Sequence, residues 1–489
     1  MARKVFISVL GATFYEQCIY GCIDEDGNII FKSSPTRFIQ QATLEYLNEC
    51  NWNDIDKNNT DKQEKIAYIL TTETAKANNW DKTITERVHF SRGKEAYEGL
   101  ESVLAKMQLD FKYESLNIPN GNNELEMWNI FNKLYEKLED GDELYFDLTH
   151  SFRYIPMLVL VLGNYAKFLK KVSIRSITYG NLEASKSRND AIAPIIDLLP
   201  LTTLQDWTFA AADYLKNGKA DRFFELASDY KAAIFKGMKK GDTGRAKEVE
   251  ELAKSLQVVA DDFHVCRCNE IIQKQHLSNL KNKLESVQNT VIEPVNPVIE
   301  KLKEAFQPFA EYESEEEQQC KDGFAAAWWC LCHNLHQQAA TIVQESIVSL
   351  ICYRHNINIT SKDERKYVNE AFAITYTLNA SDTLDDTRKD MEKYVYENKM
   401  VSKLMKDDII TDKELYRSFK IITDERNDIN HGGMRPAPHQ IKTIKRNVTK
   451  ATLSFIKKLS PSLWKHILHM KENDSITKDI MQEIDKMYK

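Results

Sequence analysis

Strand and helix patterns alternate through the first 180 residues of the chain, and this alternation restricts the possible folds more than any other feature. Apolar, β-branched runs predict strands at residues 4–10, 65–70, 111–118, 144–149 and 172–179. Helical spacing lies between them at residues 36–50, 94–107, 124–138 and 151–170, and Asp26-Gly27 predicts a hairpin within residues 18–33. Strands joined by helices of these lengths predict an α/β, Rossmann-like domain with a mostly parallel, doubly wound sheet.

The rest of the chain has the pattern of helices. Residues 188–201 are polar at first and contain two prolines, which predicts a linker. Helical spacing then recurs at residues 204–215, 221–235, 245–285, 298–309, 323–354, 363–373, 394–405, 413–430, 441–459 and 463–488. A chain of 489 residues is expected to hold two or three domains. We therefore predict a nucleotide-type domain at residues 1–185, a linker and all-α connector at 186–320, and an all-α domain at 321–489.

Composition and charge exclude several classes of protein. No apolar run approaches the roughly 18 residues of a membrane span, and the start lacks the apolar core of a signal peptide, so we expect a cytoplasmic protein. Nine cysteines, an odd number, argue against a disulfide framework. The pairs Cys266-Arg-Cys268 and Cys330-Leu-Cys332 lack the spacing that zinc usually requires, so no metal site is expected. A net charge of −7 disfavours general coating of nucleic acid, although a local basic groove stays possible.

Small, hydroxyl, amide and cationic residues follow the predicted strands, at the edge where such sheets bind ligands. The candidate ligand-binding residues are Gly11, Ala12, Thr13, Thr72, Asn120, Gly121, Thr149, His150, Ser151, Arg153 and Asn181. The chain has neither the Gly-x-Gly-x-x-Gly fingerprint nor a Walker-type phosphate loop, which disfavours ordinary nicotinamide, flavin and nucleoside-triphosphate sites.

The richest part of this edge is Asp147-Leu-Thr-His-Ser-Phe-Arg153. It passes from a strand into the predicted start of a helix, where free backbone N–H groups and the helix dipole favour an anion. Arg153 adds a cation, whereas the Ser151 hydroxyl has an alternative role as a helix N-cap. Asp147 is interpreted as an organiser of the turn, because its charge would repel a phosphate.

A second constellation lies near the C-terminus, where Arg426 precedes His431 by five positions and Asn427 and Asn430 lie between them. A fixed cation, an imidazole and flanking amides are suited to cleaving a phosphodiester. On an ideal helix the two residues are roughly 140° apart, so they need a helix end or a second subunit to share a groove. Gly432-Gly433 can supply the helix end. A purely structural role for Arg426 and His431 is the alternative.

Three segments of the N-terminal third resemble the CRISPR-associated Rossmann fold, or CARF: Leu10–Tyr15, Ile118–Gly121 and Asp147–Arg153. The last segment is most similar to the Asp-x-Thr-His-Gly branch, with Ser151 in place of the glycine. The resemblance covers roughly residues 1–185. It implies a homodimer that binds a cyclic oligoadenylate across its two-fold axis, with cyclic tetra-adenylate favoured.

The segment Arg426-Asn-Asp-Ile-Asn-His431 resembles the Arg-x4-6-His signature of HEPN ribonucleases. This resemblance implies a composite active site, with one Arg/His set from each subunit of the dimer. It also implies metal-independent attack of the RNA 2′-hydroxyl on the adjacent phosphate, which leaves a 2′,3′-cyclic phosphate and a 5′-hydroxyl. His431 would act in proton transfer and Arg426 would stabilise the charge on the phosphate.

The two resemblances occur in the order expected for an ancillary effector of type III CRISPR defence. Our leading hypothesis is an endoribonuclease that cleaves single-stranded RNA when a cyclic oligoadenylate binds, as a homodimer or a higher assembly. The alternative is a non-catalytic nucleotide sensor whose helical domain binds a partner. A small-molecule enzyme of the Rossmann type is disfavoured by the missing glycine fingerprint. Degradation of the activator by the N-terminal domain stays open.

Overall fold

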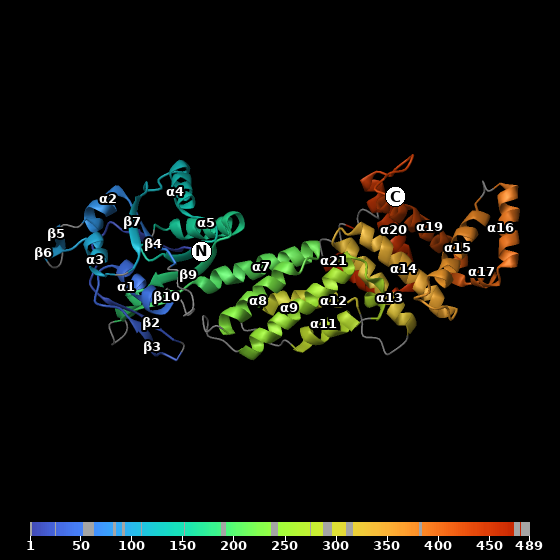
Figure 1. Cartoon of the computed structure of the whole chain (residues 1–489), viewed down its shortest axis with the longest axis horizontal. Helices are drawn as coiled ribbons and strands as arrows, with labels where there is room; N and C mark the ends of the chain where they lie inside the picture. Colours follow the sequence, from blue (N-terminus) through green and yellow to red (C-terminus); the bar gives the residue numbers. More distant parts are fainter. Residues whose placement is uncertain are drawn as a thin grey trace. The chain divides into compact units, whose positions relative to one another are not determined.

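The structure is a computed structural model of the whole chain (Figure 1). It describes residues 2–24, 26–51, 63–81, 85–89, 93–108, 110–150, 152–186, 192–235, 243–273, 275–286, 296–309, 316–380, 384–473 and 480. The chain forms two compact units, Met1–Thr203 and Leu204–Lys489. The boundary between the two units falls inside helix α7 (Leu199–Asn217).

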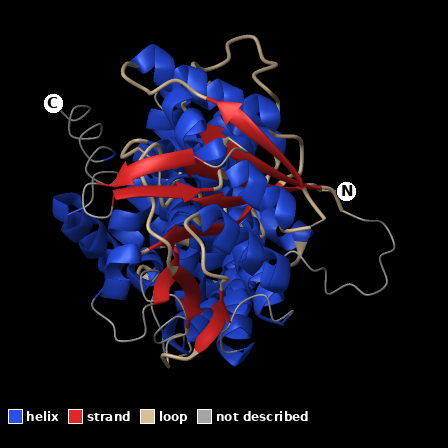
Figure 2. Ribbon diagram, turned by 90° about the vertical axis from the view of Figure 1, so that its left-hand side faces the viewer, coloured by secondary structure: helices blue, strands red, loops and turns tan. Residues whose placement is uncertain are grey.

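An eight-stranded sheet forms the centre of the first unit, and its strands are red in Figure 2. In spatial order the strands are β3 (Ile29–Lys32), β2 (Ile19–Ile23), β10 (Ile192–Asp197), β9 (Ser173–Gly180), β8 (Glu143–Asp147), β1 (Lys4–Leu10), β4 (Lys65–Thr71) and β7 (Lys112–Asn117). Strands β9, β8, β1, β4 and β7 all run parallel. β10 is antiparallel to β9 and carries the predicted hairpin β2–β3 beyond it. The prediction of a mostly parallel, Rossmann-like sheet is confirmed.

Helices cover both faces of this sheet, because alternate residues of each central strand face opposite sides. In the fully buried β1, Val5 and Ile7 pack with α4 (Glu124–Lys137) and α5 (Ile155–Lys170). Phe6 and Leu10 instead pack with the side that carries α1 (Ile39–Tyr46) and α3 (Leu100–Lys106). Short π-helical turns, η1 (Leu47–Asn51) and η2 (Lys76–Trp80), extend α1 and α2 (Glu73–Ala75). The doubly wound arrangement thus follows from apolar runs that are buried on both faces.

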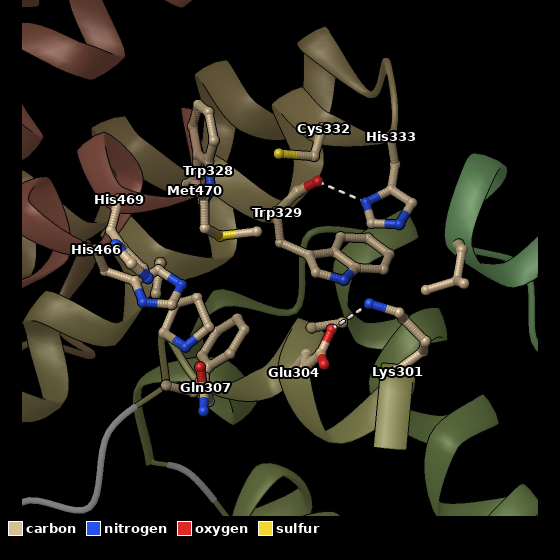
Figure 3. A pocket seen from close by; sticks show the side chains of 15 residues that line it. Lys301, Glu304, Gln307, Trp328, Trp329, Cys332, His333, His466, His469 and Met470 are labelled. Carbon is tan, nitrogen blue, oxygen red and sulfur yellow. Dashed lines mark hydrogen bonds and ion pairs between the residues drawn. The ribbon is translucent and has the colours of Figure 1, made fainter. Parts of the chain in front are cut away.

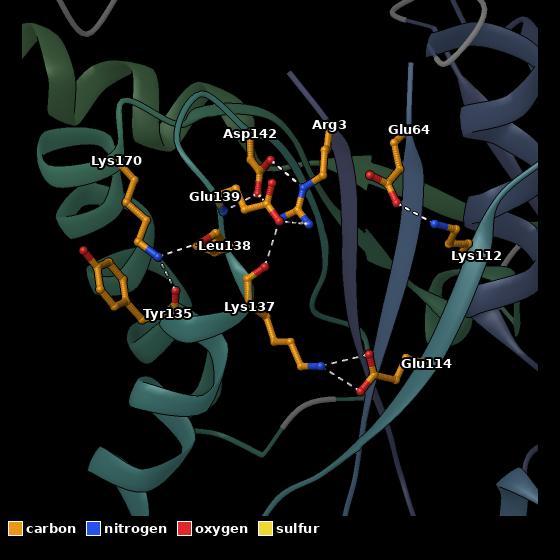
Figure 4. Close-up of polar contacts among 10 residues, drawn as sticks. All are labelled: Arg3, Glu64, Lys112, Glu114, Tyr135, Lys137, Leu138, Glu139, Asp142 and Lys170. Atoms are coloured by element: carbon orange, nitrogen blue, oxygen red, sulfur yellow. Dashed lines mark hydrogen bonds and ion pairs between the residues drawn. The ribbon is translucent and has the colours of Figure 1, made fainter. Parts of the chain in front are cut away.

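Ion pairs and hydrogen bonds link neighbouring elements at the end of the sheet where the parallel strands begin (Figure 4). Arg3, just before β1, donates to both carboxylate oxygens of Asp142, just before β8, at 3.1 and 2.8 Å. This hydrogen bond raises the pKa of Arg3. Lys170 at the end of α5 donates to the carbonyl oxygens of Tyr135 and Leu138 at the end of α4. These charged side chains are therefore paired with groups at the same end of the sheet, where the parallel strands begin. The candidate ligand-binding residues lie at the opposite end, where the parallel strands finish.

Two segments of the first unit were assigned the wrong type of structure. Residues 94–97, expected to start a helix, belong to β6 (Gly93–Tyr97), which pairs with β5 (Thr85–His89). The helix starts only after Gly99, whose backbone runs so close to Asp81 that a Cβ would lie 1.7 Å from its carbonyl oxygen. Residues 188–201, expected to be a linker, contain strand β10 and the start of α7. The two prolines led to the prediction of a linker. The apolar residues of β10 are nevertheless buried, because β10 pairs with β9 and so joins the sheet.

The regular elements among the described residues of the second unit are all helices. Its helices are α7, α8 (Asp221–Phe235), α9 (Thr243–His264), α10 (Cys268–Gln273), α11 (Gln275–Ser286), α12 (Asn296–Phe306), α13 (Glu316–Cys332), α14 (His336–Arg354), α15 (Lys362–Leu378), α16 (Asp385–Glu397), α17 (Lys399–Leu404), α18 (Asp408–Thr411), α19 (Lys413–Asn430), α20 (Ile441–Leu459) and α21 (Pro461–Asn473). None of the described helices is long and apolar enough to cross a membrane. The helical prediction for this half of the chain is confirmed, with the bounds of α19 and α20 as expected.

One hydrophobic core runs through the helical unit and joins its middle and C-terminal segments. Phe263 of α9 packs on Trp329 of α13 with 4.7 Å between ring centroids, and Phe372 of α15 stacks on Phe419 of α19 at 4.0 Å. The predicted block at residues 323–354 is divided into α13 and α14 by a turn in which Asn334 has a φ of 59°. The division between a connector at 186–320 and a separate domain at 321–489 stays a prediction.

A glycine sets the closest approach between α13 and α14. A Cβ on Gly323 would lie 1.7 Å from Oγ and 2.7 Å from Cβ of Ser346. We expect Gly323→Ala to destabilise the protein by about 1–3 kcal/mol through overpacking, although alanine is the better helix former. Urea unfolding should show this loss, and the added change Ser346→Gly should recover most of it. An unchanged or raised midpoint in Gly323→Ala would contradict this account of the packing.

Candidate functional site

A buried carboxylate organises the carboxyl-terminal edge of the sheet. Asp147 at the end of β8 accepts hydrogen bonds from Ser8 Oγ of β1 at 2.6 Å and from Thr149 Oγ1 at 2.6 Å. The Thr149 hydroxyl oxygen in turn accepts a bond from Gly180 N of β9 at 2.8 Å. Burial raises the pKa of Asp147, while its hydroxyl and backbone donors act in the opposite direction. The predicted role of Asp147 as organiser of the turn is confirmed by these contacts.

His150 lies beside Gly11, in a buried pair with the ring of Tyr15. The two rings stack with centroids 4.2 Å apart, and a Cβ on Gly11 would lie 2.4 Å from the Tyr15 hydroxyl. His150 Nε2 and the Tyr15 hydroxyl are buried and have no hydrogen-bond partner among the described residues. Burial lowers the pKa of His150 to about 4 and raises that of Tyr15. At neutral pH this edge therefore presents an uncharged imidazole and an uncharged phenol.

Amide side chains hold the loop that follows β1. Asn79 Nδ2 donates to the carbonyl oxygens of Gly11 at 2.7 Å and Thr13 at 2.9 Å, and Asn78 Nδ2 donates to that of Ala12 at 3.0 Å. The backbone of the predicted residues Gly11, Ala12 and Thr13 is thus fixed by contacts to its carbonyl oxygens. Neither asparagine was predicted from the sequence to contact this loop. Two adjacent amide side chains shortly after the end of a predicted strand could have indicated such a role.

A polar hollow of about 390 Å³ lies at the ends of β4 and β7. Its lining includes Asn120, Glu126 and Lys133, together with residues that follow Thr72. Thr72 accepts a hydrogen bond from Ala75 N and so caps α2. Gly121 has a φ of 74°, and a Cβ there would lie 1.9 Å from the Tyr154 hydroxyl, which donates to Asn120 O. These contacts bring the 118–123 loop against the segment that precedes α5.

The predicted phosphate-binding turn differs from its expected form. Helix α5 begins at Ile155 and not at residue 151, with Tyr154 at the N-cap position and no side-chain cap. Ser151 lies outside the described residues, so its proposed N-cap and ligand roles have no structural account. Arg153 is exposed in the turn before α5, and Asn181 follows β9 at the same edge. The start of the helix was misplaced because the residue pattern continues into this turn, whereas Pro156 fixes the first helical turn.

The second candidate site lies on α19, where Arg426 contacts α14. Arg426 Nη1 donates to Gln344 Oε1 at 3.2 Å, and Nη2 lies 3.6 Å from Glu345 Oε1. Glu345 is shared with Arg365 of α15, which also donates to it. Arg426 Nε is buried without a hydrogen-bond partner among the described residues. Sequence reasoning did not find Gln344 and Glu345, because they are about 80 positions away in the chain.

His431 sits at the C-cap of α19, where Gly432 and Gly433 end the helix with φ values of 63° and 71°. The prediction that these glycines end the helix is confirmed. His431 and Asn427 are exposed, and Asn430 accepts a hydrogen bond from Gln337 of α14 at 3.2 Å. Within the described part of the chain no hydrogen bond joins Arg426 to His431. One copy of the chain thus presents an exposed imidazole and a half-buried guanidinium on one helix end.

A further cavity of about 660 Å³ lies in the helical unit, lined by Trp328, Trp329 and His333 among others (Figure 3). His333 stacks on Trp329 at 3.8 Å and donates from Nδ1 to the Trp329 carbonyl oxygen at 2.7 Å. Burial lowers the pKa of His333 to about 4. The histidine is therefore held as a neutral core residue, as expected for a polar group on this helix.

Comparisons with known proteins define the class of the first unit. Residues 5–183 match the family model described as CRISPR system endoribonuclease Csx1, CARF domain. The N-terminal unit is thus a CARF domain, and the predicted resemblance is confirmed. The similarity to CARF-containing, CRISPR-associated proteins is thus located in the first unit.

Two individual proteins give further similarity. CRISPR-associated protein MJ1674 of Methanocaldococcus jannaschii is 28% identical over 141 residues, which are 28% of this chain and 22% of that protein. The chain therefore spans about a fifth of the length of this curated relative. A structure of Enterococcus italicus Csm6 bound to cyclic hexa-2′-fluoro-hexa-dAMP is similar with a TM-score of 0.43 and 12% identity, covering 98% of this chain and 100% of that one.

The buried His150 predicts a pH dependence of stability. The unfolded chain protonates this imidazole below about pH 6.5, whereas the folded chain does so only below about pH 4. Its contribution to the unfolding free energy is full above pH 6.5 and falls, by roughly 3 kcal/mol, as the pH drops to 4. Urea unfolding of His150→Phe, which keeps a ring against Tyr15, should be less sensitive to pH over this range. Equal losses in both proteins would contradict a buried, neutral His150.

Proposed function

We propose that this protein is a cyclic-oligoadenylate-activated, metal-independent endoribonuclease that cleaves single-stranded RNA in type III CRISPR defence. The observation that carries the proposal is the exposed His431 at the glycine-ended terminus of α19, one and a half turns beyond Arg426, in a chain that begins with a CARF domain. The CARF domain senses the activator, and the helical unit carries the HEPN-type chemistry.

The activator site is the carboxyl-terminal edge of the sheet. Thr149, His150 and Arg153 follow β8, with the Gly11–Thr13 backbone on one side and Asn181 on the other. Neutral donors and one cation suit a ligand with phosphates and aromatic bases, because a phosphate gains from Arg153 and is not repelled. Thr72, Asn120, Gly121 and Ser151 complete the proposed set. We favour cyclic tetra-adenylate as the activator.

An apolar stripe supports a homodimer as the active form. Met157, Val161, Tyr165 and Phe168 recur along one side of α5 and are exposed, Phe168 to 85%. Trp128 of the neighbouring helix α4 is exposed to 54%. A stripe of this width on an otherwise polar surface is typical of a protein interface. We propose that a second copy of the chain covers this stripe and that the composite active site takes one α19 end from each copy.

The chemistry follows from the groups on α19. His431 transfers a proton as the RNA 2′-hydroxyl attacks the adjacent phosphate, a role for which histidine is the side chain most often used. Arg426 stabilises the negative charge that grows on the phosphate in the transition state. Asn427 and Asn430 orient the imidazole or the phosphate. The products carry a 2′,3′-cyclic phosphate and a 5′-hydroxyl, and no metal ion is needed.

One observation favours a second candidate function. Arg426 is engaged by Gln344 and Glu345, the partners that a purely structural arginine would have. On this reading the protein is a non-catalytic nucleotide sensor, and its helical unit binds a partner protein. The two functions differ in whether purified protein cuts RNA.

The test is cleavage of a labelled single-stranded RNA, with and without linear or cyclic tri-, tetra- and hexa-adenylates, in the presence of EDTA. We expect cyclic tetra-adenylate to stimulate cleavage most. His431→Ala should lower the rate by about 10²–10⁴-fold, because general acid–base catalysis is lost. Arg153→Ala should raise the activator concentration needed for half-maximal cleavage and leave the maximal rate unchanged.

Controls separate the outcomes of this test. His276→Ala, at a histidine paired with Asp262 elsewhere in the helical unit, should cleave like the wild type. An RNA with a single 2′-deoxy position should resist cleavage there. If no adenylate stimulates cleavage, the enzyme hypothesis fails and the sensor hypothesis is favoured. Cleavage that persists in His431→Ala would mean that the active site lies elsewhere.

The dimer is tested by placing a charge in the apolar stripe. Phe168→Glu should shift the protein from dimer to monomer in light scattering and abolish adenylate-stimulated cleavage, because burying an unpaired carboxylate in an interface is costly. Tyr396→Glu on α16 is the matched control, since Tyr396 is exposed to 88%. A dimer that survives Phe168→Glu would exclude this stripe as the interface.

A further inference from the structure

Helix α19 carries a second cluster of polar side chains, on the face opposite to solvent. Glu425 and Asp428 are three positions apart on this helix and therefore lie on one side of it. His439, just before α20, completes the cluster. One ligand atom from each of the three residues lies within 4.8 Å of the others. Among the described residues, this is the only such group of three potential metal ligands.

The two carboxylates are buried, at 1% exposure for Glu425 and 2% for Asp428. His439 Nδ1 lies 2.9 Å from both Glu425 oxygens, and Asn447 of α20 donates to Oε1 at 2.6 Å. Asp428 Oδ2 accepts a bond from His439 N at 2.8 Å. Its other oxygen, Oδ1, is buried and receives no hydrogen bond from any described residue. Two buried carboxylates with ligand atoms within 4.8 Å of each other require compensation of their negative charge.

The cation nearest to Oδ1 supplies little of that compensation. Arg435 Nε lies 4.0 Å away, beyond hydrogen-bonding distance, and its side chain is 38% exposed. The imidazole of His439 is also exposed, to 37%. A divalent ion between the three side chains would satisfy Asp428 Oδ1 and neutralise both carboxylates, while Arg435 turns to solvent.

We propose that Glu425, Asp428 and His439 form a binding site for one divalent transition-metal ion. Two carboxylates and one imidazole are a donor set of the kind that Mn²⁺ and Zn²⁺ accept, with water in the positions that face solvent. The spacing on α19 and the place of His439 ahead of α20 mean that the ion joins the two helices. It thereby fixes residues 432–440, the segment that directly follows His431.

This role is separate from the proposed RNA chemistry. None of the three residues is assigned a contact with RNA, so the ion stabilises the helix end and takes no part in cleavage. Binding can therefore be measured in the absence of RNA and activator. A failure of the metal proposal leaves the ribonuclease proposal intact, and the reverse also holds.

The test is titration of the full-length protein with MnCl₂, with free Mn²⁺ followed by electron paramagnetic resonance. Manganese is the probe because thiols compete poorly for it, whereas the free cysteines of this chain would compete for zinc. We expect one tightly bound Mn²⁺ per chain and a thermal midpoint that rises with Mn²⁺. Asp428→Asn and His439→Gln should each weaken binding by at least about tenfold.

His276→Ala is the matched control, because His276 Nδ1 lies 2.6 Å from Asp262 in a comparable histidine–carboxylate pair. It should bind Mn²⁺ like the wild type. Asp428 is buried, so circular dichroism must show that Asp428→Asn is folded. The exposed His439 gives a second variant that does not depend on this. The proposal is overturned if the wild type binds no Mn²⁺, or if both variants bind it as tightly as the wild type does.

Discussion

The hydrogen bonds to the buried carboxylate of Asp147 are the interactions on which the carboxyl-terminal edge of the sheet depends. This carboxylate accepts hydroxyl bonds from Ser8 of β1 and from Thr149, and Thr149 in turn contacts β9. Three neighbouring parallel strands are thus tied together at the point where they end. Because a buried charge is tolerated only when its acceptors are filled, the turn after β8 has little freedom. His150 is consequently held against the ring of Tyr15.

The end of α19 has one face that is exposed to solvent and one face that is fixed by buried contacts. Glu425 and Asp428 point to the interior and hold the start of α20, whereas Asn427 and His431 point to solvent. Gly432 and Gly433 supply the left-handed conformations that end the helix beyond the imidazole. An exposed histidine therefore stands at a helix end whose inner face is held by contacts with the segment before α20 and with α20 itself.

Much of the fold could be predicted from local patterns, and the errors share one cause. Strand-like residue patterns identified β1, β4, β7, β8 and β9, and a clear helical period gave α19 and α20 their bounds. The pattern failed at β6, which pairs with the preceding strand β5, and at β10, which pairs with β9 and with the distant strand β2. It placed the start of α5 too early for a related reason. Polar turn residues before Pro156 look like a first helical turn until the sheet fixes their course.

The sequence by itself determined the chemistry available at each site: the glycines after β1, the Thr149-His150 pair, and Arg426 with His431. Each is encoded within a few positions, so residue type and spacing suffice to find it. Only the tertiary structure decided which distant side chains meet them. Tyr15 covers His150, Asn79 holds the loop after β1, and Gln344 with Glu345 engages Arg426. Such partners are fixed by packing between elements far apart in the chain, and no local pattern records that packing.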